Sequence, residues 1–149
     1  MRFTKLSEAT TNSVLDTRKI IRNNSADRPT SANGFVYFFR PGTNGHRVHE
    51  TGLKIHVAIA PEDVESAIPI IKGTFWENQI GEQCKVVIDA SWSINNLQHG
   101  KEFTLYFSPE GYYNMYGIRK LVSDLERKLK RAGIKLRSEE RFSRNAETD

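Results

Sequence analysis

The sequence has few of the residues that build covalent or membrane-spanning frameworks. It contains one cysteine, Cys84, among 149 residues, which excludes a disulfide framework and a cysteine-rich zinc site. The longest apolar run, around Phe35–Phe39, is far shorter than the ~18 residues that a membrane-spanning helix needs. No charged start followed by an apolar segment marks a secretory leader. We therefore expect a soluble protein that works in a reducing compartment, and any export would not use a cleaved hydrophobic leader.

The sequence also lacks the common motifs for binding phosphates, metals or nucleotides. It has no Walker loop, no Gly-x-Gly-x-x-Gly and no Gly-x-Ser-x-Gly. His46 and His49 lie in an expected loop, with no cysteine nearby and no carboxylate at ligand spacing, so we expect no metal site. Lys and Arg number 22 against 18 Asp and Glu. This mild basic bias fits a negatively charged partner, and it fits an ordinary solvated surface equally well.

The length suits one globular domain with its own core. Composition divides the chain into three parts. Residues 1–32 are poor in large apolar side chains and predict a flexible segment or docking arm. Residues 33–136 predict the folded α+β domain. Residues 137–149 form a polar, arginine-containing tail that we expect to complete or cover a site.

Within the first part, Leu15, Ile20 and Ile21 predict one short helix. The stretch Asn23–Ala32, with Pro29, has the composition of a linker. Segments of this kind either fray or dock on a partner.

Four segments of the main part predict strands. Apolar and other residues alternate with period two in Gly52–Ala60 and in Phe103–Phe107, which indicates one core-facing side for each. Phe35–Arg40 is aromatic and contains valine, and Lys85–Asp89 is a short candidate. With the helices described next, these strands predict a single α+β domain, with an antiparallel or mixed sheet and helices packed on one face.

Two helices are expected beside these strands. Pro61 followed by acidic residues is typical of a helix start, but Pro69 should kink or end that helix, leaving Gly73–Gln83 irregular. The clearest helix is Asn114–Ala132, with Gly133 as its end signal. One apolar stripe runs along it, made by Ile118, Leu121, Val122, Leu125 and Leu129.

The strand alternation gathers candidate chemistry on the non-core side. Lys54 and His56 share one face of their strand, ~7 Å apart. Lys85 begins a neighbouring candidate strand, and Tyr106 points away from the core side of another. If the strands are adjacent, two lysines, a histidine and a tyrosine converge, and neighbouring ammonium groups lower each other's pKa toward that of a usable base. The alternative is an ordinary solvated strand face.

The motifs Gly52-Leu-Lys-Ile-His-Val-Ala-Ile, Lys85-Val and Gly100-Lys-Glu-Phe-Thr-Leu-Tyr-Phe-Ser-Pro-Glu give the chain a family resemblance. In order and spacing it resembles the phosphothreonine lyases, which are OspF/SpvC/HopAI-type bacterial effectors and the lyase domains of class III and IV lanthipeptide synthetases. The resemblance covers roughly residues 33–145. It implies cofactor-free β-elimination of phosphate from phosphothreonine or phosphoserine, which leaves dehydrobutyrine or dehydroalanine.

The resemblance also implies roles for matched positions. Lys85 is similar to the general base and His56 to the general acid. Lys54 matches the group that holds the phosphate or the developing enolate, and Tyr106 matches an active-site tyrosine. A protonated histidine and a neutral lysine would give a bell-shaped pH–rate curve.

The phosphate-binding arginines of the family match less completely. The effectors carry an arginine shortly before the glycine of the Phe-Thr-Leu-Tyr strand, and Ile94–His99 contains none. Arg144 fits one of their two C-terminal arginines. Together with Lys54, the expected phosphate ligands are therefore Arg144, Arg40 and Arg141, with His99 as a further candidate.

The resemblance implies a phosphorylated protein or peptide as partner, with a host MAP kinase as one candidate, and an effector acting in the host cytoplasm. We expect a monomer without membrane contact. Two alternatives stay open. One is a phosphopeptide-binding module without turnover. The other, less favoured, is a small nucleic-acid-binding domain that uses the basic helix 114–132.

Overall fold

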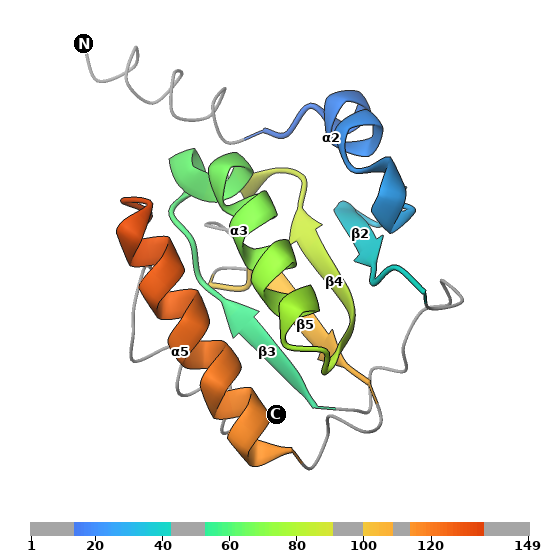
Figure 1. Cartoon of the computed structure of the whole chain (residues 1–149). Helices are drawn as coiled ribbons and strands as arrows, with labels where there is room; N and C mark the ends of the chain where they lie inside the picture. The colour runs from blue at the N-terminus through green and yellow to red at the C-terminus, as the bar shows by residue number, and fades with distance from the viewer. Residues whose placement is uncertain (1–13, 43–52, 91–99, 109–113, 136–149) are drawn as a thin grey trace, which may run out of the picture.

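The computed structural model describes residues 14–42, 53–90, 100–108 and 114–135, and Figure 1 shows them in colour. They form a single α+β domain. The sheet order is β1-β2-β4-β5-β3, and every pair of neighbouring strands in it is antiparallel. The strands are β1 (Thr30–Ala32), β2 (Phe35–Phe39), β3 (Lys54–Val57), β4 (Gly81–Val87) and β5 (Phe103–Phe107). The expected fold class is confirmed.

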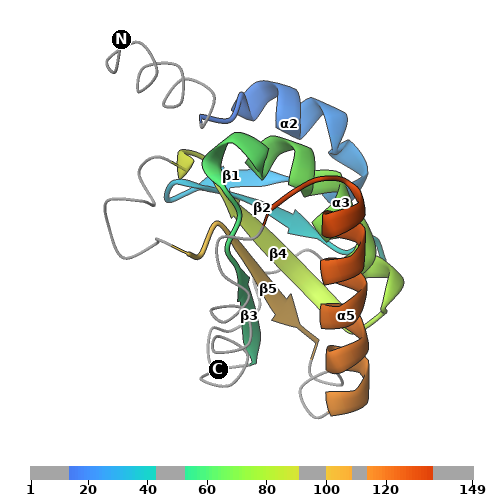
Figure 2. The same ribbon diagram turned by 90° about the vertical axis from the view of Figure 1, so that its left-hand side faces the viewer.

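The helices among the described residues are α2 (Thr17–Asn23), α3 (Val64–Glu77) and α5 (Met115–Arg131), with short 3-10 turns at Ser25–Asp27 and Pro61–Asp63. Figures 1 and 2 show α3 and α5 side by side on one side of the sheet, as the sequence predicted. None of the helices that the structure describes is long and apolar enough to cross a membrane.

The core lies between this helical layer and the sheet. Alternate strand residues such as Phe38, Ile55 and Leu105 are fully or almost fully buried, as are Phe75 of α3 and Leu125 of α5. They belong to one continuous apolar cluster. The side-chain period of two then puts the intervening residues of the same strands on the opposite face of the sheet.

The prediction that Pro69 would kink or end a helix is wrong, because α3 continues through it to Glu77. Proline removes the N–H that would bond to the carbonyl of Glu65. Both residues are exposed, so water can satisfy that carbonyl. Burial of Ile68 and Ile71 on the opposite side of α3 holds the helix together.

The expected irregular stretch Gly73–Gln83 is also mostly regular, since α3 reaches Glu77 and β4 begins at Gly81. A Cβ on Gly81 would lie 2.7 Å from the ring of Phe75, so only glycine lets the strand begin this close to the helix. The early start places Lys85 in the middle of a seven-residue strand. Hydrogen bonding of β4 to β2 on one side and to β5 on the other therefore fixes the position of Lys85.

The linker expected at Asn23–Ala32 instead contains a 3-10 turn and the edge strand β1. Asp27 is buried, forms an ion pair with Lys72 and accepts a hydrogen bond from Trp76 Nε1 at 3.2 Å. Both partners belong to α3, so this stretch is fastened to the folded domain.

Replacing Asp27 by alanine should lower the free energy of unfolding by about 3 kcal/mol, because it leaves the largely buried Lys72 ammonium and the Trp76 N–H without their acceptor. Urea denaturation followed by circular dichroism measures this. The exposed Glu126→Ala variant removes the same charge and should change stability by less than about 0.5 kcal/mol. Equal midpoints for the two variants would mean that the Asp27 contact does not hold the domain.

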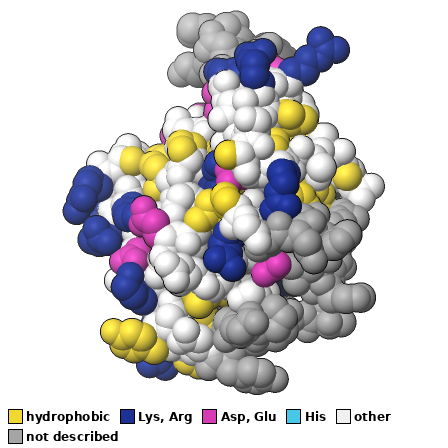
Figure 3. Space-filling model, turned by 45° about the vertical axis from the view of Figure 1, so that its right-hand side comes forward, with side chains coloured by type: hydrophobic (Ala, Val, Ile, Leu, Met, Phe, Trp, Pro, Cys, Tyr) yellow, Lys and Arg dark blue, Asp and Glu magenta, His cyan; other side chains and the backbone are white. Residues whose placement is uncertain are grey.

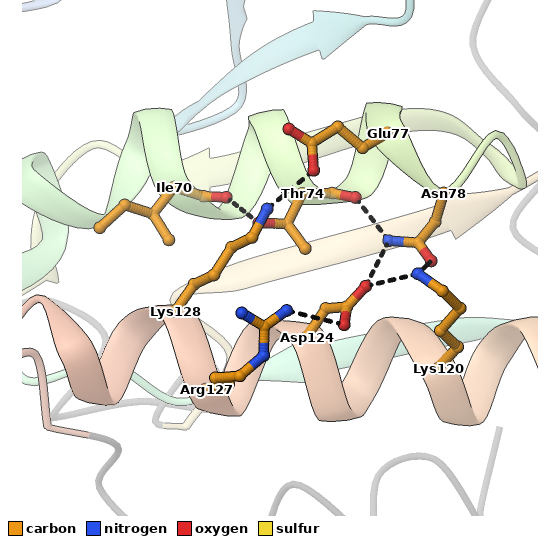
Figure 4. A network of polar contacts seen from close by, with 8 residues as sticks. All are labelled: Ile70, Thr74, Glu77, Asn78, Lys120, Asp124, Arg127 and Lys128. Carbon is orange, nitrogen blue, oxygen red and sulfur yellow. Dashed lines mark hydrogen bonds and ion pairs between the residues drawn. The ribbon is translucent and has the colours of Figure 1, made fainter.

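A polar network joins α3 to α5 (Figure 4). Asp124 accepts hydrogen bonds from Lys120 at 2.8 Å and from Arg127 at 3.1 Å. These two cations lower the pKa of Asp124 to about 2. Lys128 bonds to Glu77 of α3 at 2.7 Å. Several cations of the basic helix are thus engaged by carboxylates of the protein itself.

Candidate active site

The strand register brings the predicted site residues together on the sheet face opposite α3 and α5. Thr104 of β5 is the register partner of His56 on one side and of Lys85 on the other. Paired residues point to the same face, so these three side chains form one row across β3, β5 and β4. The backbones of His56 and Lys85 are two strand spacings apart, about 10 Å. Their side chains lie on either side of Thr104.

A second row lies beside the first. Tyr106 is the register partner of Lys54 on β3 and of Gln83 on β4. Lys54 and Tyr106 are each two residues from the His56–Thr104 pair along their strands, so they share its face. The structure therefore brings together the four residues that the sequence predicted for catalysis.

This face is not the solvated strand face of the alternative interpretation. His56 is 6% exposed, Tyr106 5% and Thr104 1%, whereas Lys54 and Lys85 are half-buried. His56 Nδ1 lies 3.2 Å from Thr104 Oγ1, a hydrogen bond whose donor depends on the imidazole tautomer. This bond engages Nδ1 and holds the orientation of the imidazole ring.

Burial and the neighbouring lysines all lower the pKa of His56. Its pKa falls from 6.5 to about 4, first because burial disfavours the charged imidazolium, and then because Lys101, Lys54 and Lys85 repel it. At neutral pH, His56 of the free protein is therefore neutral. We refer to Lys54, His56, Lys85 and Lys101 as the lysine–histidine cluster.

Aromatic rings surround the amine of Lys85. Its Nζ lies 4.1 Å from the ring centre of Phe35 and 5.8 Å from the ring centres of Tyr37 and Tyr106. The faces of these rings attract an ammonium group and limit its rotamers. Lys85 is thus held on the face that carries His56.

Sequence analysis did not identify Lys101 as a site residue, although it lies inside the quoted Gly100–Glu110 motif. It precedes β5 and follows Gly100, whose φ of 84° is a left-handed turn. Strand alternation does not extend through such a turn, so the sequence carried no signal for the side of the sheet on which Lys101 lies.

The arginines are less well placed. Arg40 follows the end of β2, and its carbonyl accepts a hydrogen bond from Arg28 at 3.0 Å. Alternation puts residue 40 in the row of Phe38, which faces the helices, so the register does not bring it to the lysine–histidine cluster. Its phosphate-binding role stays a prediction. Three further candidates lie outside the described residues: Arg141, Arg144 and His99.

Nothing in the described ranges resembles a metal centre, since no three His, Cys, Asp or Glu side chains there lie close enough to share an ion. Cys84 is fully buried on the helix side of the sheet, and burial raises the pKa of its thiol. It is therefore an apolar core residue and not a reactive thiolate.

No family model matches the chain, and no curated protein matches its sequence. Among solved structures, the chain is similar to the type III effector and phosphothreonine lyase OspF from Shigella flexneri, with a TM-score of 0.55 and 25% sequence identity. The match covers 72% of this chain and 58% of that chain, so it spans less than two thirds of the effector. This similarity supports the resemblance to the phosphothreonine lyases.

Proposed function

We propose that this protein is a phosphothreonine or phosphoserine lyase, which removes phosphate by β-elimination and leaves dehydrobutyrine or dehydroalanine. The observation that carries the proposal is the register that aligns Lys85 and His56 on either side of Thr104, with Lys54 beside them. The structural similarity to a phosphothreonine lyase supports the same conclusion.

The first requirement of the reaction is removal of the proton on Cα. That proton is very weakly acidic, so a base is not sufficient and positive charge must stabilise the enolate-like electron density as it forms. In the proposal, neutral Lys85 takes the proton with its amine, and the ammonium of Lys54 faces the developing negative charge. The electron pair of the C–H bond becomes the new Cα=Cβ bond.

The second requirement is departure of the phosphate. The Cβ–O bond breaks, its electrons stay on the phosphate oxygen, and His56 Nε2 donates a proton to that oxygen. Tyr106, in register with Lys54, lines the same face and is assigned to positioning the phosphothreonine. No water is added, so the hydroxyl is not regenerated.

A second candidate function is a phosphopeptide-binding module without turnover. The low pKa of His56 favours it, because an imidazole that is neutral in the free protein lacks the acidic second proton of an imidazolium and is a poor general acid. The same set of lysines would bind the phosphate in either case.

The mass of a phosphothreonine peptide after incubation with the protein decides between these functions. Loss of phosphoric acid, which leaves a residue lighter than threonine by one water, is the result expected for the lyase. Appearance of threonine would indicate a phosphatase, and an unchanged mass with retained binding would indicate the module. Either of these last two results would refute the proposed reaction.

The partner in this proposal is a phosphorylated protein, and action as an effector on host phosphoproteins, including MAP kinases, is the corresponding biological role. A nucleic-acid partner is less well supported. Figure 3 shows the Lys and Arg side chains of one face as separate groups with acidic side chains between several of them. On α5, Lys120, Arg127 and Lys128 are paired with carboxylates, which lowers the charge that helix offers to nucleic-acid phosphates.

A further inference from the structure

The loop before β5 is fastened between the two strands that carry the proposed acid and base. The buried carboxylate of Glu102 accepts hydrogen bonds from the N–H of Ile59 at 2.9 Å and from that of Gly100 at 3.2 Å. The carbonyl of Glu102 accepts from the N–H of Val87 at 2.9 Å. Ile59 lies three residues after His56, and Val87 lies two residues after Lys85.

These contacts determine the position of the Lys101 backbone. Lys101 lies between Gly100 and Glu102, which are both held, so its backbone is fixed just before β5, three residues before Thr104. Lys54 lies on the other side of His56, two residues earlier in β3. His56 therefore has one lysine toward each end of β3 and a third across the sheet.

Within the described residues, the charges of Lys54 and Lys101 are not engaged by a carboxylate. Other lysines of the described part, such as Lys72 and Lys128, form ion pairs with carboxylates. None of the ion pairs formed within the described ranges involves Lys54 or Lys101. The repulsion that lowers the pKa of His56 comes more from Lys101 than from Lys54 or Lys85, which agrees with this placement. The ammonium groups of Lys54 and Lys101, on either side of a nearly buried imidazole, make a site for an anion.

We propose that Lys101 is a phosphate-binding residue, which together with Lys54 holds the anion beside His56. The inference rests on the proposed function for the identity of its ligand, a phosphothreonine side chain. Lys101 approaches the phosphate from the rigid Gly100–Glu102 loop and donates a charge-assisted hydrogen bond to one of its oxygens.

Binding of a phosphothreonine peptide tests this assignment. The parent is the full chain carrying Lys85→Ala, which prevents turnover in the proposed mechanism, and the dissociation constant is measured by calorimetry at one fixed salt concentration. Adding Lys101→Ala should weaken binding by about tenfold or more, and adding Lys101→Arg by less than about threefold. Lys130→Ala, which removes an exposed lysine of α5, is the matched control and should leave the constant within about twofold.

A second measurement separates a direct role from a structural one. In the otherwise unchanged full chain, NMR titration of the His56 imidazole should show a higher pKa in Lys101→Ala and in Lys101→Met than in the unsubstituted protein or in Lys130→Ala. The methionine variant keeps the apolar stem of the side chain and guards against a folding defect.

The outcomes distinguish this inference from the proposed function. Unchanged phosphopeptide binding in Lys101→Ala, or equal weakening in Lys130→Ala, would overturn the role of Lys101 even if the unsubstituted protein eliminates phosphate. Binding that depends on Lys101 in a protein without elimination would support the inference and refute the lyase. A parent that binds no phosphopeptide would refute the role of Lys101.

Discussion

Replacing Lys85 by alanine should slow elimination from a phosphothreonine peptide by about 10²–10⁴-fold, the range expected when a general base is lost. The amine is the group proposed to take the Cα proton, and the register places it across Thr104 from His56. The rings around the Lys85 amine, those of Phe35, Tyr37 and Tyr106, are unchanged in the alanine variant, and none of them carries a charge that could replace the amine. The dehydrated product, measured over time by mass spectrometry, gives the rate.

The Lys85→Arg variant distinguishes proton abstraction from anion binding. Arginine keeps the positive charge but cannot lose its proton in a protein. It should therefore bind the phosphopeptide nearly as well as the unsubstituted protein and eliminate as poorly as Lys85→Ala. Circular dichroism checks that both variants are folded, and Lys130→Ala controls for the lost charge. Near-normal turnover in Lys85→Arg would remove Lys85 from the role of base.

Much of this site follows from the alternation of residues along strands. A period of two fixes which side chains share a face, so Lys54 and His56 had to lie together, and Tyr106 had to lie opposite the apolar side chains of its own strand. The order of the strands is a different kind of information, because it depends on pairing between distant segments. The sequence predicted that the four residues would converge only if the strands were neighbours, and the order β4-β5-β3 makes them so.

The errors arose where tertiary contacts override local preference. Pro69 lies on the exposed side of α3, where its missing N–H costs little compared with the burial of the opposite side. The polar composition of Asn23–Ala32 suggested a linker, but the partners of Asp27 lie in α3, more than forty residues later. Such a pairing leaves no periodic signal in the sequence.

The burial of His56 was not predictable for the same reason. Alternation predicted the side of the sheet on which His56 lies but not whether that side is exposed or buried. Burial matters because it changes the pKa of the imidazole. An exposed histidine has a pKa near 6.5, whereas His56 has a pKa of about 4. The groups that face it are Lys54 on its own strand, Lys85 on β4, and Lys101 and Tyr106 before and within β5.

Occupation of the site should reverse this effect. A phosphate that carries nearly two negative charges neutralises the surrounding lysines and attracts the imidazolium, so the pKa of His56 rises when the ligand binds. The bound state then holds more protons than the free state at any pH between the two pKa values. By linkage, His56 takes up a proton on binding in this window, and its contribution to binding strengthens as the pH falls through the window. The substrate itself thus provides the condition under which His56 can act as an acid.

This argument predicts two consequences for the His56→Asn variant. Elimination should slow by about 10²-fold or more, and least with a phosphate substituted to leave more easily, because such a group needs less protonation. Proton uptake on phosphopeptide binding can be measured by calorimetry in buffers of different ionisation enthalpy, using the Lys85→Ala variant so that no turnover occurs. Adding His56→Asn to this variant should remove the uptake due to the imidazole and leave only the part due to the phosphate. Equal slowing for the good and the poor leaving group would contradict the role as acid. Equal proton uptake with and without His56 would show that the imidazole stays neutral when the site is occupied, and the phosphate would then have to leave without a proton from this residue.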